Sequence, residues 1–312
     1  MRFLTVTLNS AVDRVIFIDE FKPESVMRTT RYVTSVGGKG FDTSVVLRHL
    51  GADTLAVGFM AGENGRVLQA LLENYGIRHD LVWVGGETRI AHVIAETARN
   101  RISHVIVGAL EIEPSHADAL LERIRAGLPG SAWVIGAGSI PPVVRPSLWA
   151  EVVRIARAAG VPTLIDSSGP PVFQAVEAGL DILKMNRDEF YSTFSLLPSS
   201  WDELVQAARS AAAQLGIRHL IVTCGADGIL AFTPEGDFHA VAPLQAAVNA
   251  AGAGDAVSAA LAWRLAQADE WRDALRWGAA VSAAVVLTEG TADCPIEDVQ
   301  RLLPQVRVTP LG

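Results

Sequence analysis

The sequence has 312 residues, of which 50% are hydrophobic, and a formal net charge of −8 at pH 7. This length and composition suit one large α/β domain over 1–312, and the acidic balance without Lys/Arg runs argues against binding to nucleic acid or an anionic membrane surface. The longest apolar stretch, Gly278 to Leu287, is far too short to span a membrane, and the two cysteines, Cys224 and Cys294, have no companion at metal-ligand spacing. We therefore expect reduced, packed cysteines and a cytoplasmic protein.

The first part of the chain alternates strands with helices that follow glycine-rich turns. The patterns predict strands over Arg2 to Leu8, Val12 to Ile18, Tyr32 to Val36 and Asp53 to Phe59, and helices over Phe41 to Leu50 and Gly65 to Tyr75. Gly51 and Gly76 follow the two helices, where glycine commonly ends a helix. This order is typical of an α/β sheet.

Between Asp80 and Val107 the pattern changes to short strands with no helix between them. These strands are Leu81 to Val84, Ile90 to Glu96 and His104 to Val107. A small antiparallel sheet is predicted, with strands drawn from about 12–36 and 80–107. Such an insertion in an α/β chain could cover a cleft as a lid.

The alternation resumes in the remainder of the chain. Predicted strands are Trp133 to Ala137, Pro162 to Asp166, Asp181 to Met185, His219 to Thr223 and a hairpin over Ile229 to Val241. Predicted helices are Ser115 to Ala126, Ser147 to Ala159, Trp201 to Leu215 with a capping box from Ser200 to Glu203, Asp255 to Gln267, Trp271 to Leu287, and a short one that begins at Pro295. The order implies a mostly parallel central sheet covered on both faces, with ligands at the carboxyl ends of its strands.

The stretch from Asn249 to Ala256 combines a glycine-rich turn with the start of an apolar helix. Gly252, Ala253 and Gly254 let backbone N–H groups converge on one point, where the helix N-terminus adds positive charge. An anion is stabilised there, and Asp255 on the first helical turn could take a proton from an attacking hydroxyl. On this stretch alone, a structural turn with an acidic helix start is an equal alternative.

Several motifs together resemble the PfkB, or ribokinase-like, family of sugar kinases over nearly the whole chain. The motifs, in the family's order and at its spacing, are Thr7-Leu8-Asn9-Ser10-Ala11-Val12-Asp13, Gly37-Gly38-Lys39-Gly40, Leu50-Gly51-Ala52, Thr88-Arg89, Gly138-Ser139-Ile140-Pro141-Pro142, Asp166-Ser167-Ser168-Gly169, Lys184-Met185-Asn186-Arg187-Asp188-Glu189 and Gly252-Ala253-Gly254-Asp255. The chain looks most like the phosphosugar branch, which includes 1-phosphofructokinase, minor 6-phosphofructokinase and tagatose-6-phosphate kinase. The resemblance implies a ribokinase-like three-layer αβα core with a small β-sheet lid.

For the transferred phosphoryl group, the resemblance implies that Asp255 is the base and that the backbone of Gly252, Ala253 and Gly254 holds charge. It implies that Asn186 and Glu189 arrange Mg²⁺ and its waters, which is chemically sufficient because Mg²⁺ takes few direct protein oxygens. An ordinary helix start rich in acids is the alternative for this pair.

For the nucleotide, the resemblance implies ATP contacts by Thr223 and by the backbone at Gly225 and Gly228. A simple hairpin turn is nearly as good an explanation of the two glycines. Lys184 lies in an otherwise buried strand, and a phosphate would be a good reason for a lysine there.

For the acceptor, the resemblance implies that the sugar meets the side chain of Asp13 and the backbone at Gly38. Arg89 matches an arginine that contacts the substrate phosphate, Arg28 and Ser139 match supporting positions, and Lys39 adds a further positive group. A guanidinium suits phosphate because its donors form a fixed fork. An exposed edge charge for Asp13 and a solvated surface cation for each basic residue remain the alternatives.

Asp42 departs from the family, which usually has an asparagine that contacts the sugar at this position. An aspartate accepts hydrogen bonds only and adds negative charge near an anionic substrate, which predicts a difference in the accepted sugar. Val26 is a second departure, since it stands where the family has a basic residue.

The favoured hypothesis is an ATP- and Mg²⁺-dependent kinase that phosphorylates a hydroxyl of a phosphorylated ketohexose. Its alternatives are a kinase of an unphosphorylated sugar or nucleoside and a catalytically weak sugar-binding regulator. A nicotinamide-dependent dehydrogenase is disfavoured because Gly37-Gly38-Lys39-Gly40 does not have the Gly-x-Gly-x-x-Gly spacing. By analogy with the family, the lid implies a homodimer.

Overall fold

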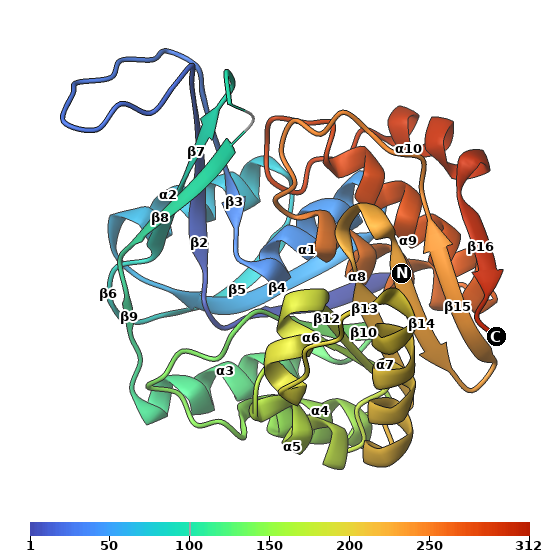
Figure 1. Ribbon diagram of the computed structural model, residues 1–312. Helices are drawn as coiled ribbons and strands as arrows, with labels where there is room; N and C mark the ends of the chain where they lie inside the picture. Colours follow the sequence, from blue (N-terminus) through green and yellow to red (C-terminus); the bar gives the residue numbers. More distant parts are fainter. Residues whose placement is uncertain (100) are drawn as a thin grey trace.

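The computed structural model describes residues 1–99 and 101–312, and its largest element is a ten-stranded sheet (Figure 1). Seven neighbouring strands are parallel: β5 (Arg78–Trp83), β4 (Asp53–Met60), β1 (Arg2–Thr7), β10 (Ser131–Ala137), β11 (Thr163–Asp166), β12 (Ile182–Asn186) and β13 (His219–Thr223). Three antiparallel strands extend the sheet beyond β13: β14 (Ile229–Thr233), β15 (Gly236–Val241) and β16 (Arg307–Pro310).

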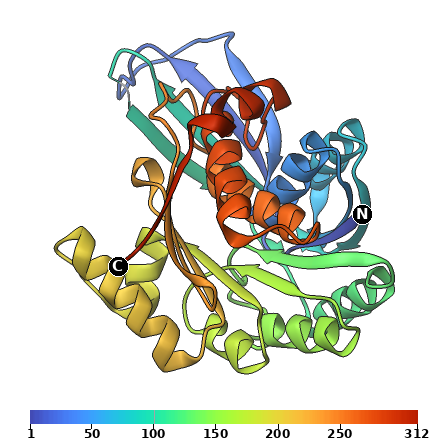
Figure 2. The same ribbon diagram turned by 90° about the vertical axis from the view of Figure 1, so that its right-hand side faces the viewer.

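Helices cover both faces of this sheet and form two separate cores (Figures 1 and 2). One face packs against α1 (Lys39–His49), α2 (Gly62–Asn74), α8 (Ala253–Leu265), α9 (Trp271–Val285) and α10 (Ile296–Leu302). The other packs against α3 (Pro114–Gly127), α4 (Leu148–Ala158), α5 (Pro171–Glu177), α6 (Arg187–Phe194) and α7 (Trp201–Leu215). Successive side chains of one strand pack into opposite cores, and in β1 Phe3 lies in one core and Leu4 in the other.

A four-stranded lid sheet stands beside the large sheet at the upper left of Figure 1. Its order is β3 (Tyr32–Gly37), β2 (Ala11–Ile18), β7 (Arg89–Glu96) and β8 (Arg101–Val107), and it has a small core of its own around Val15, Phe17 and Val93. Two short strands, β6 (Gly85–Gly86) and β9 (Leu110–Glu111), pair where the chain enters and leaves the β7–β8 hairpin.

The lid differs from its prediction in two respects. The predicted strand Leu81 to Val84 belongs to β5, which pairs with β4 at the edge of the large sheet and is not part of the lid. The lid is also a mixed sheet, because β2 runs parallel to β7 while the other two pairs are antiparallel. The sequence of a short strand indicates that it is a strand, but it does not indicate which strand it pairs with or in which direction.

Other elements also differ from the sequence predictions. Helices α5 and α6 and strand β16 were not predicted, and they are only seven, eight and four residues long. Ser200 does cap α7 by accepting from Glu203 N, but the Glu203 carboxylate accepts from Ser199 rather than from Ser200 N, so the predicted reciprocal capping box is half formed. Among the described residues, no helix is long and apolar enough to cross a membrane.

Two helices that position the site begin in the same way. Helices α1 and α8 follow Gly38 and Gly252, whose φ values of 97° and 81° lie in the left-handed region that favours glycine. A Cβ on Gly252 would lie 2.6 Å from the Ala292 nitrogen, so this turn also needs the missing side chain. Helix α8 is buried along most of its length because it packs between α1 and α9, which explains its almost uniformly apolar sequence.

Candidate active site

The carboxyl ends of four parallel strands carry the polar residues of one edge of the sheet. Asp166, Asn186 and Thr223 end β11, β12 and β13, and Ser139 follows β10. A cavity of about 450 Å³ opens at this edge, and its lining includes the first three of these residues. The site thus lies where a parallel α/β sheet commonly binds ligands.

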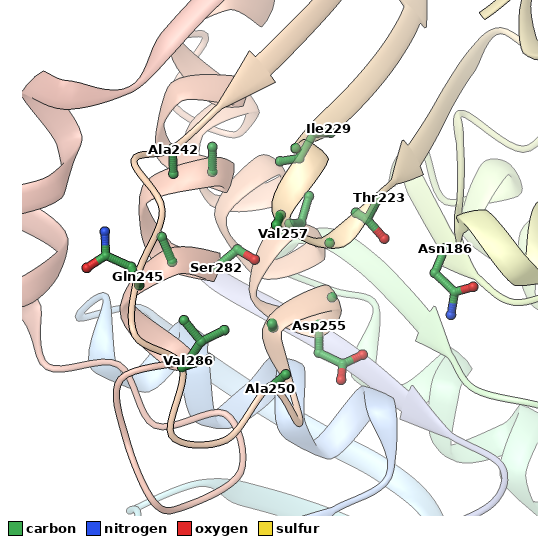
Figure 3. A pocket seen from close by; sticks show the side chains of 18 of the residues that line it. Asn186, Thr223, Ile229, Ala242, Gln245, Ala250, Asp255, Val257, Ser282 and Val286 are labelled. Atoms are coloured by element: carbon green, nitrogen blue, oxygen red, sulfur yellow. The ribbon is translucent and has the colours of Figure 1, made fainter. Parts of the chain in front are cut away.

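One wall of the cavity is apolar and the opposite side is polar (Figure 3). Helices α8 and α9, the residue Val286 that follows α9, and the segment 242–247 supply apolar groups, while Asn186 and Thr223 lie across the opening. The two predicted turn glycines both line the cavity, and Gly228 also has no room for a side chain, since its Cβ would lie 2.2 Å from the Ala240 oxygen. Gly225, at φ 60°, faces open space, which leaves its backbone accessible to a ligand.

Asp255 projects from the first turn of α8 into the cavity (Figure 3). Its side chain is largely buried, with the residue 6% exposed, and its Oδ1 has no hydrogen-bond partner among the described residues. Burial, reinforced by the charge of Asp166, raises the pKa of Asp255 to about 7. Gly252, Ala253 and Gly254 begin the same helix, whose first N–H groups lack intrahelical acceptors. A buried carboxyl group and a helix start with free N–H groups therefore share one end of the cavity.

A buried ion cluster forms the floor beside this turn. Asp166 is 0% exposed and accepts from Lys184, from Lys39 at 3.1 Å and from Ser258 at 3.2 Å. Burial favours the neutral form of Asp166, but the two ammonium groups outweigh it and lower the pKa of the carboxyl. Lys184 Nζ lies 3.4 Å from where a Cβ of Gly254 would be, so its charge adjoins the glycine turn.

Lys39 forms ion pairs with two acidic residues of the site, Asp166 and Glu189. Its Nζ lies 3.1 Å from Asp166 and 2.6 Å from Glu189, and it also lines the cavity. Burial disfavours its charge, but Asp166, Glu189 and Asp255 outweigh this effect and raise the pKa of Lys39 above its usual range. Lys39 is therefore a permanent cation at the carboxyl edge of the sheet.

Asn186 and Glu189 form a capping box at the start of α6. Asn186 Oδ1 accepts from Glu189 N at 2.8 Å, and Glu189 Oε2 accepts from Asn186 N at 2.9 Å. These bonds explain why both side chains are present at a helix start. No group of three or more acidic, His or Cys side chains that could hold a metal occurs in the described part of the chain. The two oxygen donors at the cavity still suit Mg²⁺, which keeps most of its waters.

The predicted acceptor residues meet around the end of β1 and the base of the lid. Asp13 Oδ2 accepts from Thr291 Oγ1 at 2.9 Å, and Arg89 donates to the Asn9 carbonyl at 2.8 Å. Asn9 Nδ2 in turn donates to Ser139 Oγ at 3.1 Å. Burial raises the pKa of Asp13 to about 6, although Thr291 and Arg89 partly oppose the shift. A hydrogen-bond network thus joins Arg89 to Ser139 through Asn9, and the charge of Arg89 acts on Asp13.

Arg28 lies apart from this network. It is exposed in the loop between β2 and β3, which projects beyond the lid at the upper left of Figure 1. Among the described residues, no hydrogen bond or ion pair involves its side chain. The structure therefore does not bring Arg28 together with the other predicted site residues.

Buried polar atoms without partners gather at the acceptor end of the site. Six such side-chain atoms occur among the described residues, and four of them are Thr7 Oγ1, Asp42 Oδ1, Arg89 Nε and Asp255 Oδ1. A Cβ at Gly38 would lie 3.0 Å from Thr7 Cγ2, which places that glycine against the same strand end. Because buried polar groups normally have partners, this cluster is suited to a polyhydroxylated ligand.

The sequence matches the model of the pfkB family of carbohydrate kinases over residues 4–298. The chain belongs to the PfkB family. It is therefore a carbohydrate kinase, as the order of its motifs predicted, and kinases of this family use ATP.

Curated PfkB relatives span the whole chain. A 1-phosphofructokinase from Haloferax volcanii is 32% identical over 98% of both chains. A 6-phosphofructokinase isozyme 2 from Mycobacterium tuberculosis is 26% identical over 96% of this chain and 88% of its own. Both relatives are enzymes named for phosphorylated fructose.

Solved structures confirm the predicted PfkB architecture. A possible 1-phosphofructokinase from Thermotoga maritima matches at a TM-score of 0.89 and 25% identity over 100% of both chains. Arabidopsis thaliana ribokinase, solved with ribose and ATP, matches at 0.77 over 96% of this chain and 98% of its own, and at 23% identity it bears on the fold alone. The ribokinase-like core with a small lid sheet is thus confirmed.

Two partners in this PfkB site were not assigned a role from the sequence. Asp166 stood in a motif, but nothing local indicated that it would pair with both Lys39 and Lys184. Thr291 comes from the loop after α9, far along the chain from Asp13. Alternating βα units place the ends of parallel strands side by side, so the position of Asp166 in the site could have been predicted. The contact between Thr291 and Asp13 has no signal in the sequence.

Proposed function

We propose that the protein transfers the γ-phosphoryl group of ATP to a hydroxyl of a phosphorylated ketohexose such as fructose 1-phosphate, fructose 6-phosphate or tagatose 6-phosphate. The observation that carries this proposal is Asp255, a buried carboxyl with an unpartnered oxygen at the glycine-capped start of α8, inside a cavity with an apolar wall. The relatives named as phosphofructokinases support the class of acceptor.

In this proposal Asp255 takes the proton of the acceptor hydroxyl as the hydroxyl oxygen attacks the γ-phosphorus, and the bond from that phosphorus to the bridging oxygen breaks to release ADP. The backbone of Gly252, Ala253 and Gly254 holds the charge of the transferred group, while Thr223 and the turn at Gly225 and Gly228 contact the nucleotide. Lys184 and Lys39 supply positive charge beside the phosphates. Mg²⁺, held through water by Asn186 and Glu189, would neutralise phosphate charge.

Arg89 is the proposed contact for the phosphate of the acceptor. Its Nε is buried without a partner among the described residues, while its NH2 group is fixed by the Asn9 carbonyl. A guanidinium held on one side and free on the other is suited to bind an anionic oxygen. Ser139, Asp13 and Gly38 would then contact the sugar hydroxyls and backbone face.

A kinase of an unphosphorylated sugar or nucleoside is the second candidate. It is favoured by the carboxyl groups of Asp13 and Asp255, which both disfavour a charge on Asp42, and by the position of Arg28 outside the site. A sugar-binding regulator without turnover is the third candidate, and it would leave the raised pKa of Asp255 without a use.

The test is ADP production with Mg-ATP across a panel of sugars, nucleosides and sugar phosphates, with Arg89→Lys as a second enzyme. We expect turnover with one or more ketohexose phosphates, and a higher KM for that acceptor in Arg89→Lys because an ammonium cannot reproduce the fork of donors. Turnover confined to uncharged acceptors would contradict the phosphosugar proposal, and no acceptor-stimulated turnover would favour a regulator.

The pH dependence of kcat/KM is expected to follow the ionisation of Asp255. The base must be charged, and its pKa is raised to about 7, so the charged fraction falls about tenfold for each pH unit below that value. We therefore expect the acidic limb of kcat/KM to rise with pH up to about 7. Initial rates between pH 5 and 8 measure this limb, and a flat profile would contradict the assignment of the base.

We also propose that the lid pairs with that of a second copy to form a homodimer. Strand β8 is an edge strand of the lid. It carries three apolar residues that are at least half-exposed: Val105, Ile106 and Val107, at 50%, 56% and 58%. An edge with exposed apolar side chains is prone to pair with another chain. Light scattering during size-exclusion chromatography is expected to give twice the mass of the chain, and Ile106→Lys is expected to shift the mass toward that of one chain.

A further inference from the structure

Asp42 occupies the first turns of α1, opposite the first turn of α8 that carries Asp255. The two helices pack together, and each begins at a glycine in the left-handed region. Asp42 is 4% exposed, and its Oδ1 has no hydrogen-bond partner among the described residues. The neighbouring hydroxyls are committed elsewhere, since Thr43 donates to the Lys39 carbonyl and Ser44 bonds with Thr5 and Thr54.

The charges that face Asp42 are of one sign. Asp255 approaches it from α8 and Asp13 from lid strand β2, and both disfavour its ionised form. A charge on Asp42 would also contribute to the raised pKa of Tyr75, which follows α2 and donates its hydroxyl hydrogen to Asp293. Burial, with these two carboxylates, raises the pKa of Asp42 well above its usual range.

Asp42 differs from the other two carboxyl groups in its lack of a counter-ion among the described residues. Asp255 is partly offset by Lys39 and Lys184, and Asp13 by Arg89 and His104. Lys39 is on the same helix as Asp42, but its ammonium is bonded to Asp166 and Glu189. Three neighbouring carboxyl groups cannot all be charged in a buried site, and Asp42 is the one with the least support for a charge.

We propose that Asp42 is a neutral carboxylic acid in the working enzyme and that its O–H donates a hydrogen bond to an oxygen of the acceptor sugar. This inference rests on the proposed function. A neutral carboxyl group offers one donor and one acceptor, as an amide does, so Asp42 can do what a charged aspartate cannot. It also adds no repulsion toward an anionic substrate, so the negative charge expected from the sequence is absent.

The role makes Asp42 a specificity-determining residue that acts on substrate affinity. When the group ionises at high pH, it loses its donor and gains a charge, so KM for the acceptor should rise on the alkaline side. The sign is that of an acid with a raised pKa, which is active when protonated and inactive when charged. An acceptor lacking the recognised oxygen should be rejected, because the buried donor would be left without a partner.

The direct test is infrared difference spectroscopy near neutral pH, in which the spectrum of each variant is subtracted from that of the wild type so that the other carboxyl groups cancel. We expect the wild type minus Asp42→Asn difference to contain the carbonyl band of a protonated carboxyl group, and the wild type minus Asp202→Asn difference to lack it. Asp202 is the control because it is an exposed aspartate in the first turn of α7. Absence of the band from the wild type minus Asp42→Asn difference would overturn the proposal.

The kinetic test compares Asp42→Ala with Asp42→Asn in the wild-type background. We expect Asp42→Ala to raise KM for the acceptor about tenfold or more, with a smaller effect on kcat, because a buried hydrogen bond is lost. Asp42→Asn, which keeps a donor and cannot ionise, should recover most of the affinity and lose the alkaline rise in KM. Equal losses in both variants would overturn the donor role.

The outcomes separate this inference from the proposed function. If the wild type turns over no sugar, the proposed function fails and the donor role fails with it, although the infrared band still reports the protonation of Asp42. If the wild type turns over its acceptor and the band is absent, only the inference fails.

Discussion

Replacing Asp255 by asparagine is expected to lower kcat by about 10²–10⁴-fold, the usual contribution of a general base. The isosteric amide preserves packing at the start of α8 but cannot take a proton from the acceptor hydroxyl. Binding of ATP and of the acceptor should persist, because the apolar wall, Thr223 and Arg89 are untouched. Steady-state kinetics, together with calorimetric titration of each ligand, separate the two effects.

Asp273→Asn is the matched control for this variant. Asp273 is also an aspartate in the first turn of a buried helix, α9, but its side chain is half-exposed and pairs with Arg276. We expect its kinetics to equal those of the wild type. If Asp255→Asn kept wild-type kcat, Asp255 would be only an acidic helix start, and the assignment of the base would be wrong.

Replacing Asp166 by asparagine is expected to lower the free energy of unfolding by about 3–5 kcal/mol, because it leaves a buried ammonium without its counter-ion. Lys184 is 2% exposed and pairs with Asp166, which is 0% exposed. Lys39, the other partner, can turn to Glu189 and to water, whereas Lys184 cannot. Urea unfolding followed by circular dichroism measures the change.

Two companions make the Asp166 experiment specific. The double variant Asp166→Asn/Lys184→Met should recover much of the stability, since it removes the uncompensated charge as well. Asp53→Asn breaks the exposed pair with Arg78 and should cost about 1 kcal/mol or less. A double variant as unstable as Asp166→Asn would show that the loss does not come from the charge of Lys184.

Long elements with strong periodicity were predictable from the sequence. The helix over Trp201–Leu215 and the strand over His219–Thr223 have their predicted bounds, because a capping serine, a glycine at the end of the helix and an apolar strand mark them locally. Strand β16 was missed because its four residues include a proline and are exposed or half-buried. The place of β5 in the large sheet depends on β4, and local pattern does not specify a partner.

The sequence could predict which residues lie together at the candidate site when each stands in a recognisable motif at the end of a parallel strand or the start of a helix. Asp255, Asn186, Thr223 and Lys184 all line one cavity. The state of Asp42 was not predictable, because its charge depends on Asp13 and Asp255, which reach it from a lid strand and another helix. Arg28 was matched by motif position alone, and the loop that holds it lies outside the site.

Phosphorus NMR of the protein with Mg-ATP and a ketohexose phosphate tests the proposed transfer most directly, because it distinguishes phosphorylation of the sugar from hydrolysis of ATP. We predict that the γ-phosphorus signal of ATP is replaced by a second phosphate-ester signal on the sugar, at a rate that Asp255→Asn lowers about 10²–10⁴-fold. Conversion of ATP to ADP and inorganic phosphate alone, with every ketohexose phosphate tested, would contradict the proposal.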